Sequence, residues 1–208
     1  MATDETKFAR FVIFINCLVP VTLLGWDLLH HRLGANPLEF VTRTTGILIL
    51  TFLLLTLTIT PIRKITGWNW LIKFRRMLGL FAFFYGTLHF ITYIWFDRGF
   101  NLTSTIQDIA KRPFIAVGMT SYFLLIPLAI TSTNNWIRRL GGKRWNRLHK
   151  LIYVAAAGGV IHFYMLVKSD VRLPIAFGSV LAILLCFRLV KAYWPKASHP
   201  ASATQSSS

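Results

Sequence analysis

The chain has 208 residues, of which 54% are hydrophobic and only 14% are charged. Soluble domains carry about 25% charged residues, so this composition excludes an ordinary water-soluble globule, and its hydrophobicity excludes disorder over most of the chain. Lys and Arg outnumber Asp and Glu by 23 to 7, which gives a net charge of +16. A basic, apolar chain is typical of a membrane protein with cationic loops rather than of a nucleic-acid-binding protein. Two cysteines, Cys17 and Cys186, are too few for a disulfide framework or a zinc site.

Six apolar stretches are candidates to cross a bilayer as helices, which takes about 20 residues with a range of about 17–25. They cover residues 11–26, 44–61, 77–96, 113–131, 151–167 and 173–187, the last continuing through Arg188 to residue 190. The connections are short, which leaves no room for a soluble catalytic domain. We predict an all-α integral membrane protein, a bundle of six transmembrane helices in one domain over residues 1–196. A Ser- and Ala-rich tail follows at 197–208, which we expect to be disordered.

The distribution of charge predicts how the bundle is oriented. Lys and Arg concentrate at the N-terminus and in the segments 62–76, 138–150 and 188–196. The alternate loops, at 27–43, 97–112 and 168–172, hold fewer cations and five of the seven acidic residues. Cytoplasmic loops carry the excess of Lys and Arg, so both termini are expected in the cytoplasm. The expected surroundings are membrane lipid, and we expect no nucleic-acid partner.

Two histidines lie deep inside predicted helices and at a matched depth. His89 comes twelve residues after Met77, and His162 comes eleven residues after Leu151. Both helices rise from the predicted cytoplasmic side, so the two residues lie about 18 and 16 Å along them. Ionisable groups within a membrane are costly and usually functional. Neutral imidazole is a good iron ligand, so the pair is a candidate for the two axial ligands of one haem.

A haem also needs space beside its ligands. Gly86 lies three residues before His89, and Gly159 lies three residues before His162, so each glycine shares a helix face with its histidine. The two glycines are therefore candidates for the small residues that leave room for the macrocycle. Close packing of helices through small residues is the alternative for either helix alone. For the coincident pair we favour haem.

His149 and four arginines gather near the predicted cytoplasmic face. His149 lies thirteen residues before His162, about 20 Å lower along the same helix. Three interpretations of His149 stay open: the sole protein ligand of a second haem, a contact to a flavin, or an interfacial residue. The arginines suit haem propionates or a flavin phosphate, because a guanidinium group pairs with carboxylate and phosphate. Setting the topology and binding anionic lipid would explain them equally well. They are Arg75, Arg76, Arg144 and Arg147.

Several motifs resemble one known family, the haem-binding membrane subunits of the bacterial protein-methionine-sulfoxide reductase system (the MsrQ family). The motifs are Ile59-Thr60-Pro61-Ile62-Arg63, Arg75-Arg76-Met77-Leu78-Gly79-Leu80, Tyr85-Gly86-Thr87-Leu88-His89, Trp145-Asn146-Arg147-Leu148-His149-Lys150-Leu151-Ile152-Tyr153 and His162-Phe163-Tyr164. The resemblance runs from Leu28 to about Tyr193. The family belongs to the ferric-reductase-like transmembrane domains, which include the NADPH oxidases.

The resemblance implies a function in electron transfer. It implies b-type haem, one or two per chain, held by these histidines, with FMN associated with the subunit. It implies that electrons come from a cytoplasmic flavin reductase or the quinone pool and pass to a periplasmic molybdopterin subunit that reduces methionine sulfoxide in proteins. The location implied is the bacterial inner membrane. This chain has one histidine on its third helix where the oxidases have two, and arginine at the inner position.

The chemistry of sulfoxide reduction is expected in the partner, because no residue of this chain is suited to that step. The chain would then be the electron-transfer subunit of an oxidoreductase system. One alternative is a self-standing cytochrome b that reduces ferric iron or oxidises quinol. A second alternative, from a different class, is a non-redox membrane anchor for a periplasmic enzyme, with the histidines as packing residues.

Overall fold

The computed structural model describes residues 3–193, and all the regular secondary structure in that range is helical. Residues 194–196 of the predicted domain and the predicted tail at 197–208 lie outside the described residues. The elements in chain order are α1 (Thr3–Leu29), α2 (Pro37–Thr66), the 3-10 helix η1 (Asn69–Leu71), α3 (Ile72–Ile91), the π-helix η2 (Thr92–Asp97), α4 (Leu102–Lys111), α5 (Pro113–Ile130), α6 (Asn134–Leu148), α7 (Leu151–Leu166) and α8 (Arg172–Tyr193).

Five of the six predicted spans are supported by length and composition. The helical segments long and apolar enough to cross a membrane are Asp4–Leu29, Pro37–Thr66, Asn69–Asp97, Pro113–Ile130 and Arg172–Lys191. The sixth, α7, is apolar but has only 16 residues. At 1.5 Å per residue it rises about 24 Å, less than the hydrocarbon core of about 30 Å. Length alone therefore does not make α7 a complete span.

The ends of the helices follow local sequence. Asn36 caps α2 with its side chain, which accepts a hydrogen bond from the backbone nitrogen of Glu39, and proline follows at the first helical position. Gly67 ends α2 in the left-handed conformation, with φ of 75°. A tight turn to α3 follows. The result is a pair of antiparallel neighbours, α2 and α3.

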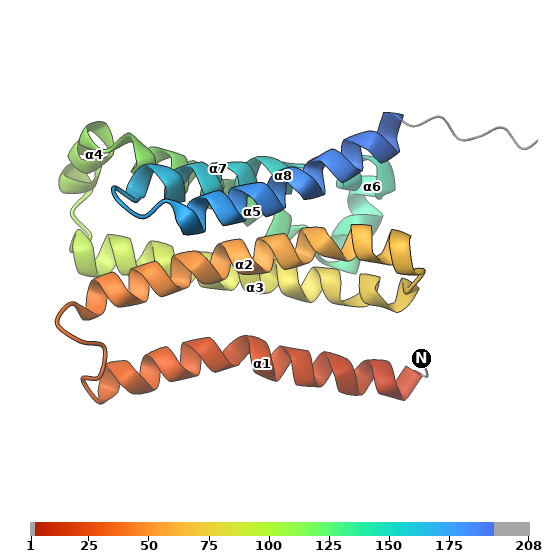
Figure 1. Ribbon diagram of the computed structural model, residues 1–208, viewed down its shortest axis with the longest axis horizontal. Coiled ribbons are helices and arrows are strands. Elements are labelled where there is room, and N and C mark those ends of the chain that lie inside the picture. Colours follow the sequence, from red (N-terminus) through yellow and green to blue (C-terminus); the bar gives the residue numbers. More distant parts are fainter. Residues whose placement is uncertain (1–2, 194–208) are drawn as a thin grey trace, which may run out of the picture.

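Two closely packed helix pairs, α2 with α3 and α5 with α7, form the centre of the bundle. The pairs meet through contacts of α3 with α5 and of α2 with α7, and α8 packs against α2 and α7. The first residues of α1 and the last of α8 lie at the same end of the bundle, together with α6 (Figure 1). The helix α4 lies at the opposite end, which we call the α4 end (Figure 1).

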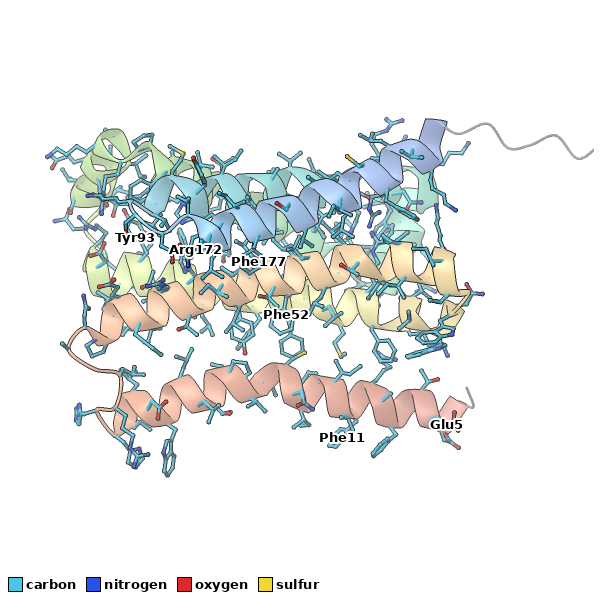
Figure 2. All side chains as sticks on the ribbon, in the orientation of Figure 1. Glu5, Phe11, Phe52, Tyr93, Arg172 and Phe177 are labelled. Carbon is cyan, nitrogen blue, oxygen red and sulfur yellow. The ribbon has the colours of Figure 1, made fainter. Side chains whose placement is uncertain are left out.

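The N-terminal helix α1 runs along the outside of the α2–α3 pair (Figure 1). Phe52 lies on the α1 side of α2, whereas Phe11 lies on the face of α1 turned away from the bundle (Figure 2). The hydroxyl of Tyr85 donates a hydrogen bond of 2.7 Å to the carbonyl of Cys17 in α1. The Tyr85 ring is fully buried and stacks on Phe52, with centroids 5.4 Å apart. Tyr85 therefore links α1 to both helices of the first pair.

Two segments that the sequence suggested were loops are helical. The segment at 97–112 contains α4, and the segment at 138–150 contains most of α6. The helix α6 bends at Gly141, whose φ of 71° and ψ of 149° interrupt the helical geometry. Hydropathy detects long apolar segments only. The helices α4 and α6 are polar on much of their surface, so hydropathy gives no signal for them.

Removing the Tyr85 hydroxyl should weaken the attachment of α1. Tyr85→Phe deletes a buried hydrogen bond, and we expect a loss of about 1 kcal/mol in the free energy of unfolding. The measurement is the thermal unfolding midpoint of the purified protein in detergent, with hydrogen exchange across α1. Tyr164→Phe, which removes the hydroxyl of an exposed tyrosine on α7, is the control and should leave both unchanged. Equal midpoints and equal exchange for Tyr85→Phe and the unmodified protein would contradict this role.

Candidate functional site

The structure brings His89 of α3 and His162 of α7 together in the interior of the bundle. Their ring centroids are 6.3 Å apart, and the ring planes are perpendicular, at 90°. Each histidine comes from a different helix pair, so the two pairs place one imidazole each on a shared centre. The matched depth that the sequence indicated is thus a matched position in space.

The hydrogen bonds of the two rings define which nitrogen is available to a metal. His162 donates from Nδ1 to the carbonyl of Phe114 at 2.7 Å, and His89 donates from Nδ1 to the carbonyl of Thr42 at 3.0 Å. A carbonyl can only accept, so Nδ1 carries the hydrogen in both rings. The hydroxyl of Thr45 lies 3.2 Å from Nδ1 of His89 as a second acceptor. Nε2 of each neutral ring therefore keeps its lone pair, which is the arrangement of a metal-binding histidine with a second partner that orients it.

The separation of the rings would suit a single metal ion held by both residues. A metal–imidazole bond of about 2 Å to each ring, with the half-width of each ring added, would put the centroids about 6 Å apart. The observed separation is 6.3 Å. The donor set, two neutral imidazoles, is one that iron in a b-type haem accepts. The two residues therefore fit the group that the sequence suggested.

The glycines beside the rings are not the two that the sequence suggested. A Cβ atom on Gly86 would meet the Tyr122 ring at 3.3 Å, and one on Gly159 would meet Leu50 at 3.0 Å. Gly86 and Gly159 thus face side chains of neighbouring helices, and their role beside a haem stays a prediction. Gly46 on α2 faces the ring of His89, and Gly118 on α5 faces the ring of His162. These two contacts run between helices, so spacing along one helix gave no signal for them.

His149 lies at the other end of α7, between α6 and α7. Its Nε2 lies 3.1 Å from the hydroxyl of Thr131, and its ring stacks on Trp145 with centroids 3.9 Å apart. The indole of Trp145 donates in turn to the carbonyl of Thr131 at 2.9 Å. Burial lowers the pKa of His149 to about 4, and the charge of Arg75 acts in the same direction. His149 is therefore neutral at physiological pH.

The four candidate arginines separate into two groups. Arg75 is partly buried and interacts electrostatically with Tyr153, Arg188 and Arg63. Arg76 is exposed and donates to the side chain of Asn134 at 3.1 Å. The remaining two, Arg144 and Arg147, are exposed on α6.

The structure adds Arg188 of α8 to this cationic region. One end of its guanidinium group donates to the hydroxyl of Tyr153 at 2.7 Å and to the carbonyl of Leu57 at 2.8 Å. Its Nε is buried without a hydrogen-bond partner among the described residues. A buried donor of this kind is costly to leave unpaired, and an anionic oxygen would satisfy it. In the sequence, Arg188 is only a cation at the end of the last predicted span, and no signal there indicates its contacts with Tyr153 and Leu57.

At the α4 end, ion pairs fix the start of α5 (Figure 2 labels Tyr93 here). The guanidinium group of Arg112 donates to both oxygens of Asp108, and the hydroxyl of Tyr93 donates to Asp108 at 2.9 Å. Arg98 lies 3.6 Å from the same carboxylate. The hydrogen bond from Arg112 lowers the pKa of Asp108 below its ordinary value. Phe114, whose carbonyl accepts from His162, comes two residues after Arg112, so this cluster lies next to the histidine site.

Comparison with known proteins identifies a matching family and several similar chains. The family model of the "Ferric reductase like transmembrane component" matches residues 44–160. Three similar curated proteins, each named "Protein-methionine-sulfoxide reductase heme-binding subunit MsrQ", come from Herminiimonas arsenicoxydans, Azospira oryzae and Ralstonia nicotianae. They are 50%, 47% and 49% identical to this chain over 91%, 92% and 88% of its length. The alignments cover 87%, 84% and 85% of those proteins, respectively.

Neutralising Asp108 should loosen the corner between α4 and α5. Asp108→Asn removes the charge that Arg112 and Arg98 share, and a hydrogen bond to a charged group contributes about 1.5–3 kcal/mol. Because the pKa of Asp108 is lowered in the folded state, its contribution is present above the ordinary carboxyl pKa and disappears as pH falls through the lowered value.

The measurement is the hydrogen-exchange protection factor of α4 in detergent from neutral to acidic pH, with the pH dependence of intrinsic amide exchange divided out. The protection of α4 in the unmodified protein should fall on acidification, and Asp108→Asn should show low protection at every pH. Asp170→Asn, at an exposed position before α8, is the matched control. Unchanged protection of α4 in Asp108→Asn would contradict the role of the cluster.

Proposed function

The chain belongs to the MsrQ family within the ferric-reductase-like transmembrane proteins, and on this premise we propose that it is a haem b-containing transmembrane electron carrier of the bacterial inner membrane. In this proposal it takes electrons from a cytoplasmic flavin reductase or the quinone pool. It passes them to a periplasmic molybdopterin subunit that reduces methionine sulfoxide in proteins. The relatives' printed names supply haem binding and the reductase system, and the donor, the molybdopterin and the compartment follow from the resemblance that the sequence motifs gave.

The single observation that carries the proposal is the arrangement of His89 and His162. Their rings lie 6.3 Å apart, and each is held through Nδ1 by a backbone carbonyl of the neighbouring helix. Both Nε2 atoms are left as ligands for one iron, and a haem bound between them would supply one-electron transfer. The protein's part is to hold the ligands rigidly, to bury the centre and so to tune its potential.

A second cofactor near the α6 end of the bundle would connect the centre to an electron donor. Arg75 and Arg188 form a cationic region there with an unpaired buried Nε, and His149 lies beside Arg75 as a neutral imidazole. Haem propionates or the phosphate of FMN suit the guanidinium groups. His149 would then contact the flavin or bind a second iron as its sole protein ligand. The positive-inside rule places this end in the cytoplasm, with both termini.

The sulfoxide reduction step belongs to the partner in this proposal. The chain's own contribution would be electron delivery at the α4 end, opposite the cationic end (Figure 1). An electron carrier with its acceptor on the far side of the bilayer needs this separation of ends.

The test is the loss of haem when either ligand is removed. Purified His89→Ala and His162→Ala should each contain less than a tenth of the haem per chain of the unmodified protein, because one imidazole holds haem far more weakly than two. The measurement is the pyridine haemochrome count with the dithionite-reduced difference spectrum. His30→Ala, on the exposed end of α1, is the control and should keep full haem. Unchanged haem content in either ligand variant would overturn the assignment of that histidine as a ligand, whereas absence of haem from the unmodified protein would favour a non-redox anchor.

A further inference from the structure

On α5, the carbonyl that orients His162 and a glycine lie one helical turn apart. Phe114 supplies the carbonyl, and Gly118 comes four residues later, on the same helix face. A Cβ atom on Gly118 would lie 2.7 Å from Nδ1 and 2.9 Å from Cε1 of His162, closer than real Cβ atoms come. The imidazole therefore occupies the space that any other residue at 118 would fill.

The first helix pair repeats this arrangement. On α2, Thr42 supplies the carbonyl for His89, and Gly46 comes four residues later. A Cβ atom on Gly46 would lie 3.3 Å from Cε1 and 3.6 Å from Nδ1 of His89. That contact is tight but could be relieved by a shift of a few tenths of an ångström. The ring of His89 is thus held less closely than that of His162, and it shares its hydrogen bond with Thr45.

We propose that Gly118 and Gly46 are positioning residues, each opening its helix face so that an imidazole reaches the carbonyl one turn away and points Nε2 at the shared centre. Neither glycine has a positive φ, so the backbone conformation does not require glycine at either position. Glycine inside a helix lowers the free energy of unfolding by about 0.5–1 kcal/mol relative to alanine. The benefit that offsets this cost is the space that each glycine leaves for an imidazole ring. The inference rests on the proposed function for the identity of the ligand, while the geometry of the rings stands without it.

The hydrogen bond that the glycines permit has an electronic consequence for an iron ligand. An imidazole that donates from Nδ1 becomes a more basic ligand at Nε2. A more basic ligand favours the oxidised metal and lowers the midpoint potential. Displacing the ring from its carbonyl should therefore raise the potential. Loss of a hydrogen-bond acceptor that orients a metal-binding histidine also lowers metal affinity by about 10- to 100-fold.

A glycine that serves helix packing alone would behave differently, and the chain provides one. Gly158 on α7 faces α5, and a Cβ atom there would lie 2.2 Å from the hydroxyl oxygen of Ser121. Gly158 belongs to the same helix pair as Gly118, but no histidine atom is among its nearest neighbours. Gly158→Ala is therefore a matched disturbance of packing. Gly25→Ala on α1, where a Cβ would meet nothing within 4 Å, is the neutral control.

The experiment compares Gly118→Ala, Gly46→Ala, Gly158→Ala and Gly25→Ala in the full chain, purified in detergent. Three quantities are measured: haem per chain, the electron paramagnetic resonance spectrum with the midpoint potential of the haem-loaded fraction, and the ring tautomers of the haem-free protein by nitrogen-15 NMR of labelled histidines. Gly118→Ala should retain haem at least about 10-fold more weakly, with a changed spectrum and a raised potential. Gly46→Ala should change the same quantities in the same direction but less. Gly25→Ala should match the unmodified protein.

The outcomes separate the inference from the proposed function. Gly158→Ala should lower the yield of folded protein but leave the spectrum and potential of its haem unchanged. A wild-type spectrum and potential in Gly118→Ala, or the same shifts in Gly158→Ala, would overturn the positioning role. The NMR readout needs no haem: loss of the Nδ1 proton of His162 in Gly118→Ala supports the inference even if the unmodified protein bound none, whereas unchanged tautomers would overturn it. Absence of haem from the unmodified protein would overturn only the proposed function.

Discussion

A polar group inside a bilayer has no water to bond, so every buried imidazole N–H must find its acceptor within the protein. His89 and His162 satisfy this constraint with backbone carbonyls of neighbouring helices rather than with carboxylates. The acceptors are already fixed in helices, so each ring inherits the rigidity of the helix it contacts. The pairing of α2 with α3 and of α5 with α7 therefore also fixes the acceptor that each Nδ1 reaches.

The two ends of the bundle handle charge in different ways. At the α4 end, carboxylates and guanidinium groups neutralise each other around Asp108, and the cluster holds the start of α5 next to the histidine site. At the α6 end, Arg75 and Arg188 lie near other cations and a tyrosine, and a donor of Arg188 is left unpaired. The charges at the α4 end pair with one another, whereas the cationic α6 end would suit an anionic group from outside the chain, as proposed above.

The sequence was sufficient for an all-helical membrane protein and for the proximity of His89 and His162, because hydropathy and depth along a helix are properties of a single helix. It was not sufficient for features that depend on which helices are neighbours. Gly86 and Gly159 share a face with a histidine on its own helix, and their role beside a haem stays a prediction, whereas the glycines that contact the rings are Gly46 and Gly118, across the helix interface. The hydrogen bond of Arg188 to Tyr153 likewise depends on the packing of α8 against α7, which the spacing of residues in either helix does not predict. No spacing rule along one segment contains this information.

The short length of α7 has a consequence for the lipid around it. A helix that rises about 24 Å in a hydrocarbon layer of about 30 Å would create a hydrophobic mismatch, and local thinning of the bilayer is one way to relieve it. Arg144 and Arg147 on α6, just before α7, lie where such thinning would draw headgroups and water inward. The insulating layer between His162 and the aqueous phase is then narrowest along the helix that carries this residue. A short helix would in this way reduce the distance that an electron has to cover through a low-dielectric medium.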